Sequence, residues 1–460
     1  MHFSSVKMEQ LIKKYNVPGP RYTSYPTVPF WKNNELTENE WIESINTNYN
    51  FFQSSDVSVY IHLPFCESLC TFCGCHKRIT KNHAVETPYL EAVLKEWSLY
   101  LEKLPFQPTI KELHFGGGTP TFFSAQNLRT LVEEIFQAKS IDPASVELSF
   151  EAHPNNTSSE QLTELYNFGF HRLSLGIQDY SPIVQQAIHR IQSFEQVKKV
   201  HDEARKIGYT SISHDLVFGL PKQTLEAIID TVNKTLELKP DRISLYSYAH
   251  VPWIKGNGQR GFDENDLPQS EVKRALYEKA KQMLEINGYK EIGMDHFALD
   301  HDDLAKAFQE KKLHRNFMGY TTKATSSMIG LGMSAISDSW FGFAQNDKTV
   351  EGYIALLEEN KLPIFRGHLL SDLEVEIRGY ILDLMCHFET TFSATSNYQH
   401  IHEEIKDKLS DLINDGLVEV QGAKVIVTEK GIPFVRNCCM AFDQDLKNHP
   451  ISERLFSKTI

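Results

Sequence analysis

The sequence predicts an α/β fold: a partial (β/α)6 barrel of the TIM type, with an N-terminal arm and a small, mainly helical C-terminal domain. Six near-continuous apolar segments alternate with helical ones, which indicates βα units and a parallel sheet. Such units form either an open doubly wound sheet or a barrel. Polar or glycine-rich residues follow each of the six segments. This favours a barrel, whose active site lies at the carboxyl ends of its strands.

The six expected strands are rich in β-branched and aromatic residues. They are SVYIHL (58–63), KELHF (111–115), SVELSFEA (145–152), RLSLGIQ (172–178), SISHDLVFGL (211–220) and RISLYSYAH (242–250). Helices are expected over 87–104 and 158–169. The strand ends carry the cysteines, GGGTP (116–120), Glu151, Gln178, Asp215 and Ala249-His250. Turns alone would explain the glycines and prolines, but they explain six distinct polar strand ends less well.

The length of 460 residues fits two or three domains at roughly 150 residues each. We expect an arm over 1–50, the barrel with its extension over 51–360, and the C-terminal domain over 361–460. In the arm, the two prolines that flank the aromatics of PRYTSYP (20–26) predict extended structure packed on the surface. In the C-terminal domain, 374–388 and 400–420 have helical periodicity, and VIVTEKG (425–431) predicts a short strand and turn.

The net charge of the chain indicates which classes of binding partner to expect. The formal net charge is −13, so the chain has no electrostatic footprint for nucleic acid or an anionic membrane. The N-terminus has no apolar signal region, and no run of 18 or more apolar residues occurs. We therefore expect a cytoplasmic protein that binds neither nucleic acid nor membrane.

Four of the seven cysteines, Cys66, Cys70, Cys73 and Cys75, lie within ten residues. In a reducing compartment such a cluster indicates a metal or redox site. Three thiolates with the spacing Cys66-x3-Cys70-x2-Cys73 can bind three irons of a [4Fe–4S] cubane and leave the fourth open, whereas ordinary clusters use four cysteines. S-adenosylmethionine can chelate an open iron. One electron then breaks a C–S bond and gives a 5′-deoxyadenosyl radical.

Two other interpretations of these cysteines stay open on spacing alone. A structural zinc site could use all four, although zinc ligands usually come from two separated C-x2-C pairs and no second pair is visible. Cys75 could also be the fourth ligand of a plain electron carrier. Four unligated cysteines in ten residues are the least favoured interpretation.

Two further strand ends suit a nucleoside ligand. The glycines of GGGTP allow the backbone to approach a ligand closely and to present its N–H and C=O groups. Glu151 and Asp215 could accept hydrogen bonds from ribose hydroxyls or an amino group. Either acid taken alone would more often be a helix cap or a first-turn residue.

Longer motifs add a resemblance. YIHLPFCESLCTFCGCHKRIT (60–80), HFGGGTPTFF (114–123) and SLGIQ (174–178) resemble those of radical S-adenosylmethionine enzymes. Within that superfamily, further motifs resemble the oxygen-independent coproporphyrinogen III oxidases, in family order from about residue 18 to the C-terminus. They are PRYTSYPT (20–27), FGLP (218–221), LHRNFMGYTT (313–322), GLGMSAIS (330–337) and RNCCMAFD (436–443).

The resemblance implies a reaction and its cofactors. The family converts coproporphyrinogen III to protoporphyrinogen IX in haem synthesis, decarboxylating two propionates to vinyl groups without oxygen. Its members use a [4Fe–4S] cluster and two S-adenosylmethionine molecules. The resemblance also makes Cys75 a neighbour of the cluster instead of a ligand.

Matching positions then receive roles by resemblance. Cys66, Cys70 and Cys73 would hold the cluster. Tyr60, Gly117, Glu151, Ala249 and Ile336 would contact the first S-adenosylmethionine, and Phe72, Gly118, Thr119, Gln178, Arg190 and Asp215 the second. Tyr60, Glu151 and Arg21 are the expected catalytic residues.

A substrate with four carboxylates needs cations at the mouth of the site, and the candidates are Arg21, Lys77, Arg78 and Arg315. Arg21 is preferred because its arm could close over the barrel, although it could equally be a solvated surface charge; for the other three, a solvated surface charge is the favoured interpretation. One position departs from the family: Met318 stands where a glutamine is common, and methionine offers no comparable hydrogen bonding.

Two other functions remain in view. A haem chaperone branch of the superfamily binds haem instead of converting a porphyrinogen, but it lacks the PRYTSYP arm and the Cys75 position. A non-catalytic, metal-stabilised binding protein is the alternative from another class. For the enzyme, we expect a monomer served by an electron donor and an electron acceptor that the sequence does not identify.

Overall fold

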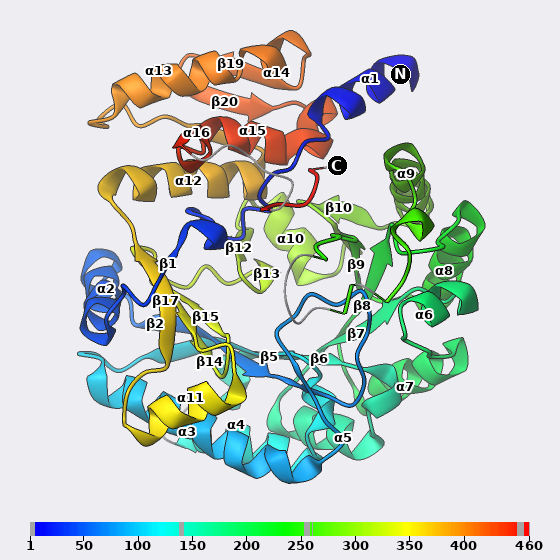
Figure 1. Ribbon diagram of the computed structural model, residues 1–460, viewed down its shortest axis with the longest axis vertical. Helices are drawn as coiled ribbons and strands as arrows, with labels where there is room; N and C mark the ends of the chain where they lie inside the picture. Colours follow the sequence, from blue (N-terminus) through cyan, green and yellow to red (C-terminus); the bar gives the residue numbers. More distant parts are fainter. Residues whose placement is uncertain (1–4, 138–141, 253–257, 260, 449–454, 460) are drawn as a thin grey trace.

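A computed structural model of the chain describes residues 5–137, 142–252, 258–259, 261–448 and 455–459. Its centre is a run of six parallel strands, which confirms the expected barrel wall (Figure 1). The strands are β2 (Asp56–Leu63), β5 (Thr109–Gly117), β6 (Glu147–Ala152), β7 (Arg172–Gln178), β8 (Ser211–Phe218) and β9 (Arg242–Ser247). Their carboxyl ends therefore meet on one face of the molecule.

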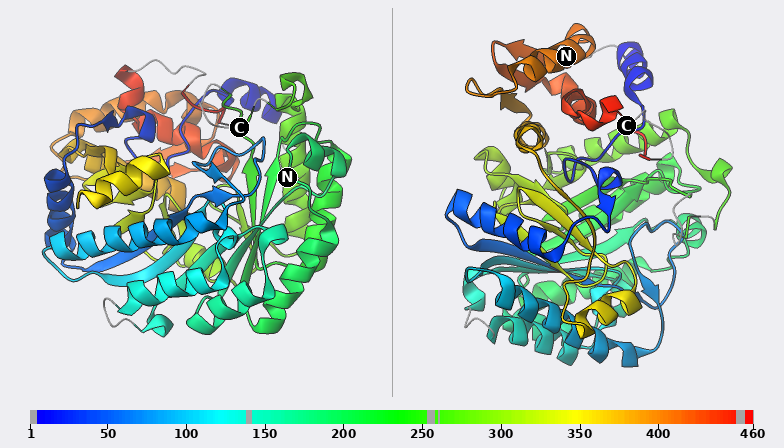
Figure 2. Two further views of the ribbon diagram at one scale, coloured as in Figure 1. Left: turned by 60° about the horizontal axis from the view of Figure 1, so that its bottom comes forward. Right: turned by 60° about the vertical axis from the view of Figure 1, so that its left-hand side comes forward.

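Helices cover the outer side of this wall, as the views in Figure 2 also show. They are α3 (Glu86–Lys103), α4 (Ala125–Gln137), α5 (Ser159–Phe168), α7 (Phe194–Ile207) and α8 (Leu225–Leu238). Local sequence starts them: Ser158 caps α5 in a capping box with Gln161, and Ser193 and Thr224 cap α7 and α8. Their apolar faces and the strands form one continuous core.

The sheet has thirteen strands and does not close, which makes the barrel partial. Beyond β2 it continues through β14 (Ser327–Leu331), β15 (Ile336–Asp338), β16 (Gly342–Asn346), β17 (Ile364–Leu369) and β1 (Lys32–Asn33). Of these five strands, β14 pairs in parallel with β2. The pairs from β14 through β15, β16 and β17 to β1 are antiparallel. At the other edge β9 pairs antiparallel with β11 (His296–Ala298), and β11 with β10 (Lys290–Ile292).

A mainly helical C-terminal unit lies at the top of Figure 1 and confirms this part of the predicted fold. It contains α12 (Asp372–His387), α13 (Gln399–Lys408), α14 (Ser410–Asn414), α15 (Val435–Phe442) and α16 (Asp445–Asn448). A three-stranded sheet joins them, in the order β18 (Glu389–Thr391), β20 (Lys424–Val427), β19 (Val418–Gln421). Its core is separate from that of the barrel.

The arm departs from the expectation of surface packing. Tyr22 and Tyr25 are only 4% and 2% exposed, because both side chains belong to the C-terminal core. The Tyr22 hydroxyl donates to Asp443 at 3.0 Å. Prolines in the sequence indicated an extended path but not the apolar partner, which lies more than 400 residues away.

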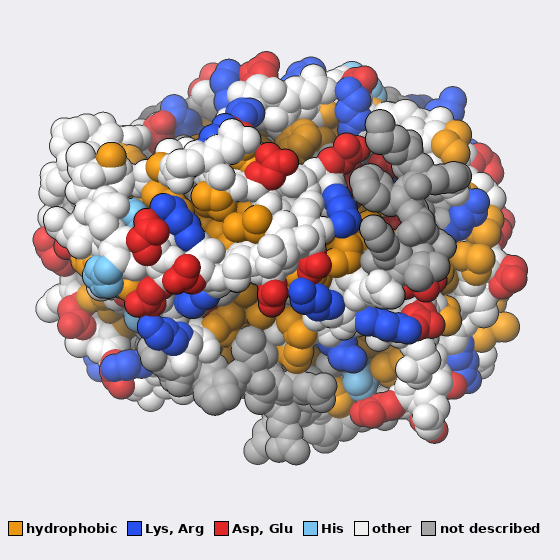
Figure 3. Space-filling view, turned by 90° about the horizontal axis from the view of Figure 1, so that it is seen from above, with side chains coloured by type: hydrophobic (Ala, Val, Ile, Leu, Met, Phe, Trp, Pro, Cys, Tyr) orange, Lys and Arg blue, Asp and Glu red, His pale blue; other side chains and the backbone are white. Residues whose placement is uncertain are grey.

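The domain boundaries at 50 and 360 stay predictions. Helix α2 (Glu38–Phe52) runs across the first, and β17 lies beyond the second while belonging to the large sheet. Among the described residues, no helix has both the length and the apolar character needed to cross a bilayer. On the face that Figure 3 shows, acidic and basic side chains are interspersed.

Candidate active site

The cysteine loop leaves the end of β2 and is closed at its base by a short parallel ladder. Strand β3 (Phe65–Cys66) pairs with β4 (Arg78–Ile79), and the Thr80 amide donates to the Cys66 carbonyl at 2.9 Å. The Thr71 amide donates to the Ile188 carbonyl at 2.9 Å and ties the loop to the barrel wall. The cysteines are therefore held at the carboxyl ends of the parallel strands.

One cavity collects eleven of the fifteen sequence-predicted site residues. Cys66, Cys70, Cys73, Phe72, Gly117, Gly118, Thr119, Glu151, Gln178, Arg190 and Asp215 all line it. Cys75 and Lys77 line it as well. The strands β2, β5, β6, β7 and β8 thus bring together residues that are up to 149 positions apart in the chain.

The donor set fits a cluster held by three cysteines. All the cysteines are free thiols. The Cys75 thiol hydrogen bonds to Cys73 and favours its thiolate, so the pKa of Cys73 is lowered. Burial raises the pKa of Cys66 to about 11, although a hydrogen bond with the Thr119 hydroxyl at 3.2 Å acts to lower it. In the described part of the chain, no group of three or more His, Cys, Asp or Glu side chains has an arrangement that could hold a single metal ion.

The glycine motif after β5 lets this strand approach the cysteine loop. A Cβ on Gly118 would lie 2.4 Å from the Pro64 carbonyl oxygen and 3.0 Å from the Cys66 Sγ. Gly117 has a φ of +120°, which an L side chain rarely adopts. The glycines therefore allow close approach to the cysteine loop, while the predicted approach to a ligand stays a prediction.

Glu151 lines the cavity from β6, and aromatic side chains lie behind it. Its Oε1 lies 3.6 Å from His114 Nε2. The Tyr60 ring stacks on His114 at 6.1 Å between centroids, and its hydroxyl lies 3.0 Å from His62 Nδ1. Gly116 leaves room for Tyr60, since a Cβ there would lie 2.8 Å from its ring.

Asp215 and Gln178 line the cavity from β8 and β7. The Ser174 hydroxyl donates to Asp215 at 2.8 Å, and burial raises the pKa of Asp215 to about 6. Gln178 has a φ of +70° at an irregularity of the β7–β8 ladder. A non-glycine residue in this conformation is strained and is typical of functional sites.

Four predicted residues do not line this cavity. Tyr60 lies against its wall through Gly116. Ile336 begins β15, where its carbonyl oxygen would be 2.4 Å from a Cβ on Gly330. The Ala249 carbonyl accepts a hydrogen bond from Gln259 at 3.1 Å. Arg21 lines a separate cavity, where it forms an ion pair with Asp295.

The other candidate cations have different surroundings. Lys77 Nζ donates to the carbonyls of Cys73 and Cys75, at 3.2 Å each. Arg78 is exposed and lies 3.0 Å from Glu351. Arg315 is 8% exposed and stacks on the Tyr320 ring at 4.5 Å.

Met318 lines a polar hollow inside the barrel. Glu151 and Asp215 line both this hollow and the cysteine cavity. The departure from the family pattern therefore lies within reach of the proposed S-adenosylmethionine sites.

Comparison with known proteins agrees with this geometry. Residues 60–235 match the family model described as the Radical SAM superfamily. The oxygen-independent coproporphyrinogen III oxidase of Escherichia coli (strain K12) is 37% identical over 98% of both chains. That of Pseudomonas aeruginosa is 35% identical, again over 98% of both chains. This chain belongs to the oxygen-independent coproporphyrinogen III oxidase family.

A solved structure of a family member agrees throughout. The coproporphyrinogen III oxidase of Escherichia coli, described as a radical SAM enzyme, matches with a TM-score of 0.88 and 34% identity. The match covers 95% of this chain and 99% of that one. Membership of the oxidase family confirms the resemblance and favours an iron–sulfur cluster over zinc at the cysteines.

Two interactions that support the site were not predicted from the sequence. Gln259 donates to the carbonyls of both Phe72 and Ala249, at 2.9 and 3.1 Å, and so joins the cysteine loop to the segment after β9. The Ser334 hydroxyl lies 2.7 Å from His76 Nδ1 and joins the loop to the GLGMSAIS motif. A lone glutamine carries no local signal, whereas His76 lies beside Cys75 and could have been suspected.

Proposed function

We propose that this protein catalyses the anaerobic oxidative decarboxylation of coproporphyrinogen III to protoporphyrinogen IX in haem synthesis. The observation that carries the proposal is the convergence of Cys66, Cys70 and Cys73 on one cavity with Gly117 and Gly118. Family membership over nearly the whole chain supplies the substrate class. The protein is an oxidoreductase of the radical SAM superfamily.

Each of the two decarboxylations has the same balance of atoms and electrons. A propionate side chain loses a hydrogen atom from its β-carbon, one electron and CO2, and becomes a vinyl group. Two such events convert two propionates and leave two intact. When bound, the [4Fe–4S] cluster and S-adenosylmethionine supply the hydrogen-abstracting 5′-deoxyadenosyl radical.

The chain's own residues would bind and orient these groups. We assign Cys66, Cys70 and Cys73 as the cluster ligands, because their thiols share one cavity wall. Thr119, hydrogen bonded to Cys66, would stabilise the thiolate. Cys75 would act through its hydrogen bond to Cys73, which favours the thiolate of that ligand.

Two groups of residues would hold the two S-adenosylmethionine molecules. The first group is Tyr60, Gly117, Glu151, Ala249 and Ile336; the second is Phe72, Gly118, Thr119, Gln178, Arg190 and Asp215. Carboxylates at the strand ends can accept hydrogen bonds from amino and ribose hydroxyl groups. Glycine backbone can approach the ligands without a side chain between.

Tyr60, Glu151 and Arg21 are the proposed catalytic residues, of which Tyr60 and Glu151 would act at the reacting centre. Tyr60 presents its ring beside His114 and its hydroxyl to His62, so its position is fixed by two neighbours. Arg21 would contact a carboxylate of the substrate, because the arm that carries it is held against the C-terminal core. We further propose that the enzyme works as a monomer in the cytoplasm with one electron donor and one electron acceptor.

An anaerobic assay tests the proposal. Coproporphyrinogen III, S-adenosylmethionine and a reductant should give protoporphyrinogen IX and 5′-deoxyadenosine. Protein reconstituted with a four-iron cluster that forms neither product would refute the proposal. Tight haem binding without turnover would instead favour the haem chaperone function.

A further inference from the structure

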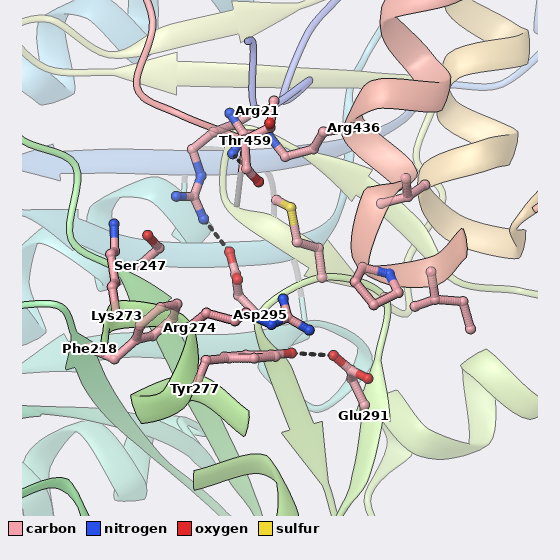
Figure 4. A pocket seen from close by; sticks show the side chains of 15 residues that line it. Arg21, Phe218, Ser247, Lys273, Arg274, Tyr277, Glu291, Asp295, Arg436 and Thr459 are labelled. Carbon is pink, nitrogen blue, oxygen red and sulfur yellow. Dashed lines mark hydrogen bonds and ion pairs between the residues drawn. The ribbon is translucent and has the colours of Figure 1, made fainter. Parts of the chain in front are cut away.

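A second cavity lies where the arm, α9 (Ser270–Ile286), the turn between β10 and β11, and α15 meet (Figure 4). Arg21 enters it from the arm, Lys273 from α9, Asp295 from the turn and Arg436 from α15. Figure 4 shows the Arg21 side chain pointing toward Asp295. Lys273 and Ser247 lie next to each other, to the left of this pair in the view. None of the residues predicted to bind the cluster or S-adenosylmethionine lines this cavity.

Among the described residues, three cations of this cavity have only one carboxylate beside them, and that carboxylate pairs with Arg21 alone. Arg21 forms an ion pair with Asp295. Lys273 Nζ donates to the Tyr248 carbonyl at 2.8 Å. Arg436 donates only to backbone carbonyls, among them that of Pro20 at 2.9 Å. Among the described residues, no carboxylate oxygen lies within 4.0 Å of either Lys273 or Arg436.

The neighbouring acids are already engaged. Glu291 accepts hydrogen bonds from Tyr277 and Lys281. Arg274, the fourth cation of the lining, is paired with Glu278 on its own helix. Of the described residues, three positive charges and one negative charge are therefore left around the cavity.

This imbalance is costly in a buried setting. Burial, together with the positive charge of Arg21, lowers the pKa of Lys273 to about 8. Burial lowers the pKa of Arg436 to about 9, again with Arg21 as the next cause. Unpaired buried charge is rarely kept in a protein without a compensating partner. An incoming anion would supply that partner.

The FGLP motif explains how Lys273 is held in place. Lys273 Nζ lies 5.8 Å from the centre of the Phe218 ring, within the range of a cation–π contact. Gly219 has a φ of +82°, and a Cβ there would lie 2.6 Å from Lys273 Cε. The motif therefore provides both an aromatic face and room for the lysine stem, which sets the ammonium group at the cavity.

Tyr246 lies between the second cavity and the cysteine cavity: it lines the polar hollow that shares Glu151 and Asp215 with the cysteine cavity, and the next residue, Ser247, lines the second cavity. Burial raises the pKa of Tyr246, and the charges of Asp215 and Asp295 raise it further, whereas that of Arg21 lowers it. Tyr246 thus lies within electrostatic range of both sites. Tyr246 and Phe72 of the cysteine loop both pack against an apolar cluster that contains Tyr248. A flat apolar ligand could lie along this cluster.

We propose that this cavity binds one carboxylate of the substrate, and that Asp295 occupies the place of that carboxylate until the substrate arrives. The inference rests on the proposed function, because coproporphyrinogen III is the tetracarboxylate in question. The carboxylate held here is not the one being removed, since the reacting propionate must lie beside the cysteine cavity. The site therefore fixes which propionate is presented.

Lys273→Met tests the site, with Lys279→Met on the same helix as the matched control. Lys279 is half-buried, and its Nζ donates to Gln282 at 3.3 Å. One charge-assisted hydrogen bond corresponds to about a tenfold change in affinity or more. We expect KM for coproporphyrinogen III to rise about tenfold in Lys273→Met, with kcat, iron content and Tm unchanged. The control should keep all four values.

Asp295→Asn provides a test of opposite sign. Without the competing carboxylate, the holoenzyme should bind coproporphyrin III, followed by its fluorescence, at least as tightly as wild type. A purely structural ion pair predicts the reverse: weaker binding and a lower Tm. That result, or an unchanged KM and porphyrin affinity in Lys273→Met, would overturn the inference. Absence of turnover in wild type would instead refute the proposed function, and the porphyrin titration would still test the cavity.

Discussion

The guanidinium group of Arg190 donates a hydrogen bond to the backbone carbonyl of Gly176 at 2.5 Å. Its Nη1 atom lies 3.8 Å from the Cys70 Sγ. Within the described residues, its buried Nε atom has no hydrogen-bond partner. One arginine thus joins the end of β7 to the cysteine loop and keeps a donor for a ligand.

Replacing Arg190 should weaken one of two S-adenosylmethionine sites. In Arg190→Gln, we expect the number of molecules bound per holoenzyme to fall from two toward one, with affinity at that site lowered at least tenfold. Iron content should stay unchanged, because arginine is not a cluster ligand. Equilibrium dialysis measures both occupancies. Lys198→Gln, at an exposed pair with Asp202, is the control. Two sites of wild-type affinity in Arg190→Gln would contradict the assignment.

Cys75 and Cys73 should respond differently to serine substitution. Cys73→Ser removes a proposed ligand and should lose most of the cluster, whereas Cys75→Ser should keep about four irons per chain. A hydroxyl at 75 can still donate to the Cys73 sulfur. Iron and sulfide analysis with visible absorption measures the outcome. Equal loss in both variants would make Cys75 a fourth ligand.

Most of the barrel could be predicted because its signals are local. The strand at 172–178 carries its β-branched and apolar residues within seven positions, and β7 has the same bounds. Tyr22 and Tyr25 show where local reasoning failed: nothing near PRYTSYP indicates a partner in α15 and its surroundings. The added antiparallel strands β15, β10 and β11 have only three residues each, and such short segments resemble loops in sequence.

The cysteine part of the site could be predicted because one short motif carries all three proposed ligands. Cys66, Cys70 and Cys73 follow one strand, so spacing alone suggested that they share a cavity. Lys273 belongs to an ordinary amphipathic helix, and its meeting with Arg21 and Asp295 depends on how the arm and the sheet edge pack. Charge convergence of this kind is visible only in three dimensions.

Glu96 should make stability depend on pH. It is fully buried in α3 and accepts hydrogen bonds from the Gly332 amide at 2.8 Å, Asn346 at 2.7 Å and Tyr353 at 2.6 Å. Burial raises its pKa from 4.5 to about 7. The folded state therefore binds the proton more tightly than the unfolded state, and this contribution is complete below pH 4.5 and is lost as pH rises through 7.

The expected size follows from the shift. Relative to Glu96→Gln, the free energy of unfolding of wild type should fall by roughly 3 kcal/mol between pH 4.5 and pH 8. Urea unfolding of both proteins at several pH values measures the difference. Glu91→Gln, at an exposed position of the same helix, should follow wild type throughout. A constant difference between wild type and Glu96→Gln would show that Glu96 does not titrate in this range.

Gly118 should be the more sensitive of two glycines in the active-site loops. A methyl group there would meet the Pro64 carbonyl oxygen at 2.4 Å, and backbone cannot move aside cheaply. Gly74 lies between Cys73 and Cys75, yet a Cβ on it would have no atom within 4 Å. We expect Gly118→Ala to lower the free energy of unfolding by about 1 to 3 kcal/mol, the range for overpacking. Gly74→Ala should leave it unchanged.

The effect of Gly118→Ala should extend to the cofactors. The same methyl group would lie 3.0 Å from the Cys66 Sγ, so relief of the clash must move either β5 or the cysteine loop. Either movement separates Cys66 from the other two thiols or displaces Thr119 from its hydrogen bond to Cys66. Iron content after reconstitution should therefore fall in Gly118→Ala and not in Gly74→Ala. If both variants kept a full cluster and wild-type S-adenosylmethionine affinity, close packing of the glycine motif against the cysteine loop would not be required for the site.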